Sequence, residues 1–270
     1  MDPISALQEP FVQRAFIAIT MASLVAGLVS LMIRYSQLQF LAVESFHALV
    51  AAAAVGYFVE LFYPVSPELV AYLVMVGLLG FLNVLEGRVE RLTAIAALSL
   101  SSATIISLFS FGLAQKSPFG STIIYNILFG TPFLILQREI PYVVIAGSVM
   151  ILVLAALWKR ILMLSFDPDY FAFMKGNNSF LLHRLFIYAM VAAAAVYLTK
   201  ITGAVAAHVL LIAPSLAPFR YVSPVTVLLY ALAVCYSAAF ASIALNLPYG
   251  AALGFFALLG YLLPALLRKG

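Results

Sequence analysis

The sequence has very few charged residues: 14 Lys and Arg and 10 Asp and Glu in 270 residues, or 9%. A soluble domain carries about 25% charged residues, so this deficit excludes an ordinary water-soluble fold. Apolar sequence takes the place of charge, because 65% of the residues are hydrophobic. The chain also lacks any hydrophilic stretch long enough for a separate soluble domain. We therefore expect residues 1–270 to form a single integral membrane domain.

Cysteine and the common catalytic motifs are also scarce. The single cysteine, Cys235, lies inside an apolar segment, which excludes an internal disulfide and a thiolate metal cluster. The sequence has no HExxH helix, no GxSxG turn and no Walker phosphate-binding loop. No enzyme site and no permanently bound cofactor are therefore expected, and any energy from ATP must come from another chain. The net charge of +4 fits basic cytoplasmic loops and does not indicate nucleic-acid binding.

Long apolar segments recur along the whole chain, each near the length of about 20 residues that crosses a bilayer. They predict about nine transmembrane helices, at roughly 11–33, 38–62, 68–85, 92–114, 140–158, 180–199, 203–219, 224–245 and 249–267. The segment Thr122–Leu136 is too short to cross, and Gly130 and Pro132 would interrupt it. We expect a re-entrant or interfacial half-helix there. The predicted fold class is an all-α polytopic membrane protein.

Basic residues predict the orientation, because they accumulate in cytoplasmic loops. The loop Lys159–Arg184 is the most basic part of the chain, and Arg268 and Lys269 follow the last span. When both are placed in the cytoplasm, Lys200 and the N-terminus lie outside. His183, next to the end of that loop, is expected to contact lipid headgroups.

Three residues within the apolar segments could take part in chemistry: Glu44, His47 and His208. Glu44 and His47 are three residues apart, and so share one helical face. Since an ionised group in mid-bilayer costs at least about 2.5–3.5 kcal/mol, such groups face a cavity or a partner. They either reach headgroups from the end of the span or form a cation site, because imidazole and carboxylate suit zinc or manganese. His208 follows the break at Gly203; it either bonds a backbone carbonyl or is a second pathway ligand facing His47.

The loop Ser165–Ser179 is amphipathic and cytoplasmic by the charge count. Asp167 can cap a short helix that begins at Pro168, with Asp169 in its first turn. The segment has more aromatic residues than a connector needs: Phe166, Tyr170, Phe171 and Phe173. The short helix is expected either to lie on the inner membrane surface or to dock on a cytoplasmic partner.

Six segments, taken in order, resemble one family, the ABC-3 permeases of zinc, manganese and iron importers. EPFVQRAFIAI resembles the start of the family's first helix, and FHALVAAAAVGYF its GDALSHA segment, with His47 on the family histidine. YNILFGTP resembles the YLFGS half-helix, GAVAAHVLLIAPSLA the GxLLVSALLIxPAATA helix, and NLPYGAA the DLPSGPA turn. The most specific segment is SFDPDYFAFMKG, Ser165–Gly176, which matches the SFDPEFARALG loop.

The resemblance implies an ABC type II importer-like permease of the plasma membrane that forms the translocation pathway as a homodimer. It implies ABC ATPase subunits, an extracytoplasmic metal-binding protein and a second copy of the chain as partners, besides the lipid bilayer. His47 would lie in the pathway of a transported divalent metal ion. The segment that couples the permease to the ATPase would include Phe166, Asp167, Pro168, Asp169, Tyr170 and Gly176.

The sequence departs from the family at the metal pathway. Where the family has an aspartate four residues before its histidine, this chain has Val43, and Glu44 lies about 100° further around the helix. His208 replaces a serine. Either Glu44 and His208 form an altered metal site, or the substrate differs. The alternatives are a permease for a metal chelate and an ion-coupled secondary transporter that uses Glu44 and His47.

Overall fold

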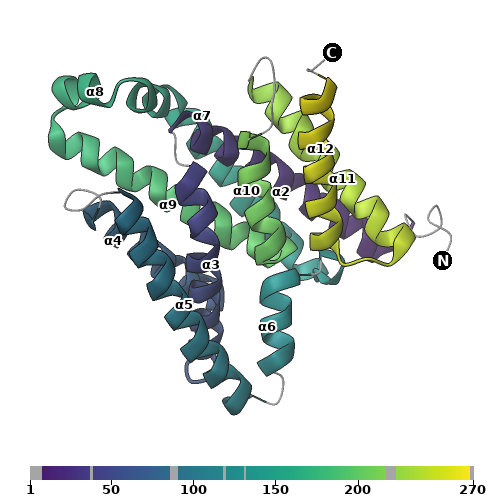
Figure 1. Cartoon of the computed structure of the whole chain (residues 1–270). Helices are drawn as coiled ribbons and strands as arrows, with labels where there is room; N and C mark the ends of the chain where they lie inside the picture. Colours follow the sequence, from purple (N-terminus) through teal and green to yellow (C-terminus); the bar gives the residue numbers. More distant parts are fainter. Residues whose placement is uncertain are drawn as a thin grey trace.

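The chain folds into packed helices, as the sequence predicts (Figure 1). The computed structural model describes residues 8–36, 39–85, 91–117, 120–130, 132–216 and 223–267, and within these ranges no strand is present. The longer helices are α2 (Pro10–Tyr35), α3 (Gln39–Glu60), α4 (Pro67–Leu85), α5 (Arg91–Lys116), α7 (Ile140–Phe166), α9 (Asn177–Thr202), α10 (Ala204–Leu216), α11 (Pro224–Leu245) and α12 (Tyr249–Leu267). The short elements are α6 (Gly120–Phe129), α8 (Pro168–Lys175) and the 3-10 turns η1 (Pro132–Leu134) and η2 (Gln137–Glu139).

The predicted spans correspond to these helices. Within the described ranges, five helices are long and apolar enough to cross a membrane, and four shorter apolar helices accompany them. Local signals set several boundaries: α2, α4 and α11 begin at a proline, whose fixed φ suits the first helical turn. The C-cap of α11 is Asn246, in the left-handed conformation at φ 52°. Residues 86–90 and 217–222, which include most of two predicted breaks between spans, and Arg268 and Lys269 lie outside the described residues.

Helix α2 lies in the centre of the bundle, in contact with α7, α9, α10 and α11. Its interior face carries the fully buried alanines Ala15, Ala18, Ala22 and Ala26. Small side chains at this spacing let membrane helices approach closely. The resulting van der Waals contact stabilises their association, because the hydrophobic effect does not drive helices together in lipid. The outer helices α5 and α7 are far less buried than α2. Only 17% of the most apolar stretch of each is buried inside the protein.

The predicted half-helix is confirmed as a short, broken segment. Helix α6 ends at Phe129, Gly130 has a positive φ of 53°, and η1 follows. Gly130 lies against Gly203, whose φ of 83° separates α9 from α10. A Cβ atom on either glycine would collide with the backbone of the other, so only glycine allows this contact. Helix α10 includes Pro214 and ends two residues later, at Leu216.

Candidate functional site

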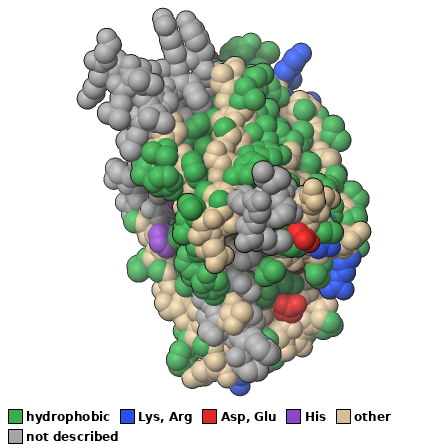
Figure 2. Space-filling model, turned by 90° about the vertical axis from the view of Figure 1, so that its right-hand side faces the viewer, with side chains coloured by type: hydrophobic (Ala, Val, Ile, Leu, Met, Phe, Trp, Pro, Cys, Tyr) green, Lys and Arg blue, Asp and Glu red, His purple; other side chains and the backbone are tan. Residues whose placement is uncertain are grey.

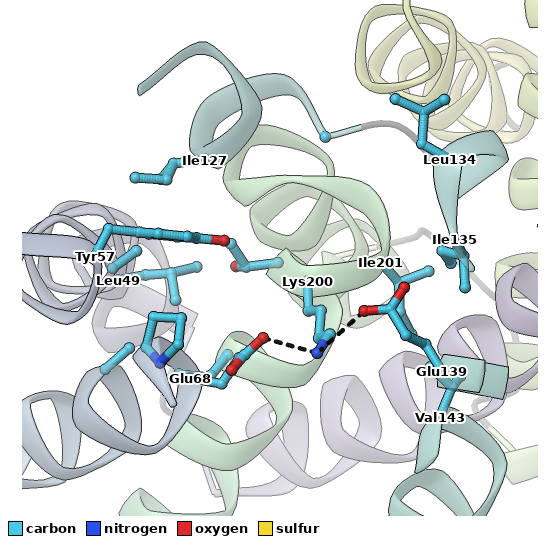
Figure 3. A pocket seen from close by; sticks show the side chains of 16 residues that line it. Leu49, Tyr57, Glu68, Ile127, Leu134, Ile135, Glu139, Val143, Lys200 and Ile201 are labelled. Carbon is cyan, nitrogen blue, oxygen red and sulfur yellow. Dashed lines mark ion pairs between the residues drawn. The ribbon is translucent and has the colours of Figure 1, made fainter. Parts of the chain in front are cut away.

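A cavity of about 360 Å³ opens between α3, α4, α6 and α9 (Figure 3). Its apolar wall includes one face of α3, on which Leu49, Ala53 and Tyr57 follow one another at intervals of one helical turn. The other side carries charged residues, so we name the whole the ion-pair cavity. Its full lining is Leu49, Ala53, Tyr57, Pro67, Glu68, Ala71, Ile127, Gly130, Leu134, Ile135, Glu139, Val143, Val196, Thr199, Lys200 and Ile201.

The charged side of the cavity is a triad of Glu68, Lys200 and Glu139 (Figure 3). The Nζ atom of Lys200 lies 2.7 Å from Oε1 of Glu68 and 3.7 Å from Oε1 of Glu139. The other carboxylate oxygen of Glu139 accepts a hydrogen bond from the Leu136 backbone N–H at 2.9 Å. Two carboxylates around one ammonium carry a net negative charge. The triad can therefore attract a further cation.

Helix ends explain why these three charges meet. Glu68 is in the first turn of α4 and Lys200 in the last turn of α9, where each charge complements the helix dipole. Glu139 ends η2, directly before α7. These are the helix ends that the charge count places outside the cell. On the side predicted to be cytoplasmic, the C-terminal ends of α2 and α7 meet, since the hydroxyls of Ser36 and Ser165 are 3.0 Å apart.

The two predicted pathway histidines each lie next to the same aromatic ring, that of Phe46. The ring of Phe46 lies 5.7 Å from that of His47 on the same helix, α3, and 5.0 Å from that of His208 on α10, between centroids. Phe46 belongs to the face of α3 that lines the ion-pair cavity further along, at Leu49 and Ala53. From Tyr57 to Phe46 the helix rises about 16 Å. Phe46, which contacts both histidines, thus lies beyond the cavity on the same face of α3.

The rest of the predicted metal site is incomplete within one chain. The backbone of Glu44 belongs to α3, but its side chain lies outside the described residues. Among the side chains that are described, no three His, Cys, Asp or Glu residues gather closely enough to hold a metal ion. His47 is exposed and His208 is half-buried.

The predicted short helix is present as α8, and its predicted cap is confirmed. Oδ1 of Asp167 accepts a hydrogen bond from the backbone N–H of Tyr170 at 2.8 Å. Gly176 ends α8 with φ 83°, and its N–H donates to the Ala172 carbonyl. Pro168 and Asp169 have helical backbone, but their side chains lie outside the described residues.

One aromatic residue anchors α8 and the others remain exposed. Phe171 is buried, and its ring lies 5.0 Å from that of His183 on α9. His183 in turn donates from Nδ1 to the Ser179 carbonyl at 2.7 Å, so its ring packs against α8 instead of reaching only headgroups. By contrast, Phe173 is 85% exposed, and two neighbours, Phe166 and Tyr170, are also exposed. A short capped helix thus presents aromatic side chains outward.

The outer surface is largely apolar. Figure 2 shows a face over which hydrophobic side chains are spread widely, with few acidic or basic ones. On α5 and α7 the exposed apolar residues are large: Leu100, Leu108, Phe111, Tyr142, Ile145 and Leu152. Lipid is the environment in which such a surface is stable.

Comparisons with known proteins agree on the kind of molecule. The sequence profile of the ABC 3 transport family matches residues 8–266. A chain of PsaBC from Streptococcus pneumoniae, solved in complex with Fab, has a TM-score of 0.80 at 18% identity over 97% of this chain and 94% of that one. An inward-facing structure of a metal-chelate type ABC transporter has a TM-score of 0.61 at 18% identity over 94% and 84%. No curated protein matches the sequence. At this identity the two structures show a shared fold.

The sequence alone did not predict a role in the cavity for Glu68, Glu139 or Tyr57. The two glutamates look like ordinary charges at helix ends, and Lys200 was used only to predict the orientation of the spans. A signal did exist, because the three charges all occur at helix ends on the side predicted to be outside. Nothing in their spacing shows that these ends meet.

Proposed function

The chain belongs to the ABC 3 transport family, and we propose that the substrate of this ABC-importer permease is a divalent metal ion, namely zinc, manganese or iron. The observation that carries the proposal is the approach of His47 and His208 to one ring, Phe46, from two different helices. Neutral imidazole is a ligand that these metals share, whereas a chelated metal offers no free position for it.

The pathway begins at the ion-pair cavity. A divalent cation is attracted by the net negative triad and competes with Lys200 for the carboxylates of Glu68 and Glu139. Beyond the cavity, the ion follows the α3 face to Phe46 and passes to the two histidines beside that ring. Ligands that are few and weak suit a transporter, because the ion must leave as readily as it enters.

A second copy of the chain completes the site in this proposal. Two histidines are too few ligands to hold a transition metal, and no third ligand joins them among the described side chains. A homodimer with the histidines near its axis doubles the number of ligands. Glu44, three residues before His47, is the nearest acidic candidate in sequence.

Energy and delivery come from partners. The chain carries no Walker loop, so ATP hydrolysis belongs to an ABC ATPase subunit. The exposed aromatic residues Phe166, Tyr170 and Phe173 of the α8 region supply the docking surface for it. An extracytoplasmic metal-binding protein delivers the ion to a permease in the plasma membrane. Membership of an ABC family favours this mechanism over an ion-coupled secondary transporter.

A permease for a metal chelate is the second candidate, because the metal-chelate type transporter shares the fold. A chelate needs a wider path and no histidine ligands. The two candidates therefore differ in what the histidines do.

Uptake by proteoliposomes that contain the permease and its ATPase separates the candidates. For the His47→Ala and His208→Ala variants we expect Zn²⁺ or Mn²⁺ uptake to fall at least about tenfold, because even the loss of a residue that only hydrogen-bonds a metal ligand costs about tenfold or more. Thr104→Ala is the control, because its exposed hydroxyl bonds only the Leu100 carbonyl of its own helix, α5. Metal uptake that survives both histidine changes would reject the ionic-metal proposal.

A further inference from the structure

A second hollow lies beside the charged triad, between α4, α7 and α9, with a volume of about 460 Å³. It shares Glu68, Glu139 and Lys200 with the ion-pair cavity. Away from these charges its lining is apolar and aromatic: Tyr72, Tyr142, Val143, Ala146, Met150, Ala193, Val196, Tyr197 and Ile201. We name this hollow the α4–α7–α9 groove.

The groove has the length of one membrane leaflet. It follows α7 from Tyr142 to Met150 and α9 from Ile201 back to Ala193. Eight residues of helix rise about 12 Å, and half of the hydrocarbon core of a bilayer is about 15 Å. The polar residues lie where these helices begin or end, so the charges mark the interfacial end and the apolar lining runs toward the bilayer centre. Tyr72 and Tyr142 are residues that favour this interface.

The groove is open toward the lipid and closed toward the protein. On α7, the neighbouring side chains Ile145 and Leu152 are 61% and 68% exposed. Its base is sealed where the Tyr197 hydroxyl of α9 donates to the Val143 carbonyl of α7 at 2.9 Å. The small side chain of Ala146 leaves space along the groove that a longer side chain would fill.

The charged triad at the end of the groove determines which lipid headgroup can bind there. Lys200 is held closely by Glu68, at 2.7 Å, and loosely by Glu139, at 3.7 Å. An ammonium group can therefore pair with Oε1 of Glu139 while a phosphate oxygen contacts Lys200. The net negative charge of the triad disfavours an anionic headgroup. We propose that the groove binds an acyl chain of a zwitterionic phospholipid, with its ammonium at Glu139 and its phosphate at Lys200.

This lipid would contact the same carboxylates that line the ion-pair cavity. The proposal does not depend on which substrate the permease carries, since neither the histidines nor the ATPase takes part in it. Its test accordingly needs no transport.

The purified chain is equilibrated in detergent micelles that contain equal amounts of phosphatidylethanolamine and phosphatidylglycerol, and retained lipid is measured by native mass spectrometry. We expect phosphatidylethanolamine to be retained about fivefold over phosphatidylglycerol, the ratio that one partly exposed ion pair produces. Ala146→Phe fills the groove and should abolish retention, whereas the control Ile145→Phe places the same phenyl ring beside the groove and should not. Glu139→Gln should bring the ratio of the two lipids close to one.

Equal retention of the two lipids by the unmodified chain would overturn the proposal. So would an Ala146→Phe variant that binds as much phosphatidylethanolamine as Ile145→Phe does. If Ala146→Phe does not elute as a folded protein in size-exclusion chromatography, Ala193→Leu narrows the same groove from α9 and gives the same comparison.

Discussion

Replacing Lys200 by methionine removes the only cation of the charged triad and leaves the length of the side chain almost unchanged. In the structure its ammonium lies between Glu68 and Glu139, the position that an entering metal ion would need under the proposed function. The substitution vacates this position and makes the local charge more negative by one unit. A divalent ion should therefore bind the cavity of the variant more tightly.

The exposure of the three charged side chains determines how much the metal affinity should change. The accessible fractions of the side chains are 44% for Lys200, 34% for Glu68 and 30% for Glu139, so solvent weakens both ion pairs. At such exposure the closer pair contributes about 1 kcal/mol and the looser one less. A metal ion that no longer displaces the ammonium gains about this free energy, which corresponds to an approximately fivefold lower KM for uptake.

Uptake of Mn²⁺ into proteoliposomes, measured over a range of metal concentrations, separates KM from kcat. Lys200→Arg is the matched control, since it keeps the charge and should leave KM close to that of the unmodified protein. A raised or unchanged KM in Lys200→Met would refute the idea that the triad is the entrance for the cation. High salt should narrow the difference between the two variants, because it screens partly exposed charges.

Two further substitutions test the local structure. Asp167→Ala removes the cap that bonds the Tyr170 N–H, which should destabilise α8 by about 1 kcal/mol and reduce co-purification of the ATPase subunit. Gly203→Ala forces a Cβ atom into Gly130 and strains a positive φ, so we expect a loss of about 2–3 kcal/mol, seen as a lower midpoint of thermal unfolding. Gly254→Ala in helix α12 is its control: a Cβ there meets nothing within 4 Å in the surrounding structure, and the midpoint should stay the same or rise.

The features that the sequence predicts well are local ones. The spans follow from runs of apolar residues, and α8 follows from the Asp-Pro pair at 167–168, because caps and hydropathy act over a few neighbouring residues. The charged triad depends on the packing of three helix ends that are far apart in the sequence. Each of its residues, taken alone, is an ordinary boundary charge. The role of Phe46, which both histidines contact, likewise depends on how α10 packs on α3.

The contact between Gly130 and Gly203 lies between the charged triad and the histidines. Lys200 lies three residues before Gly203 in α9, and His208 lies five residues after it in α10. The same contact joins Gly203 to the end of α6, which borders the ion-pair cavity. A change in the angle between α9 and α10 at this glycine would therefore move the charged triad relative to the histidines. Alternating access requires the two ends of a pathway to move relative to the site between them.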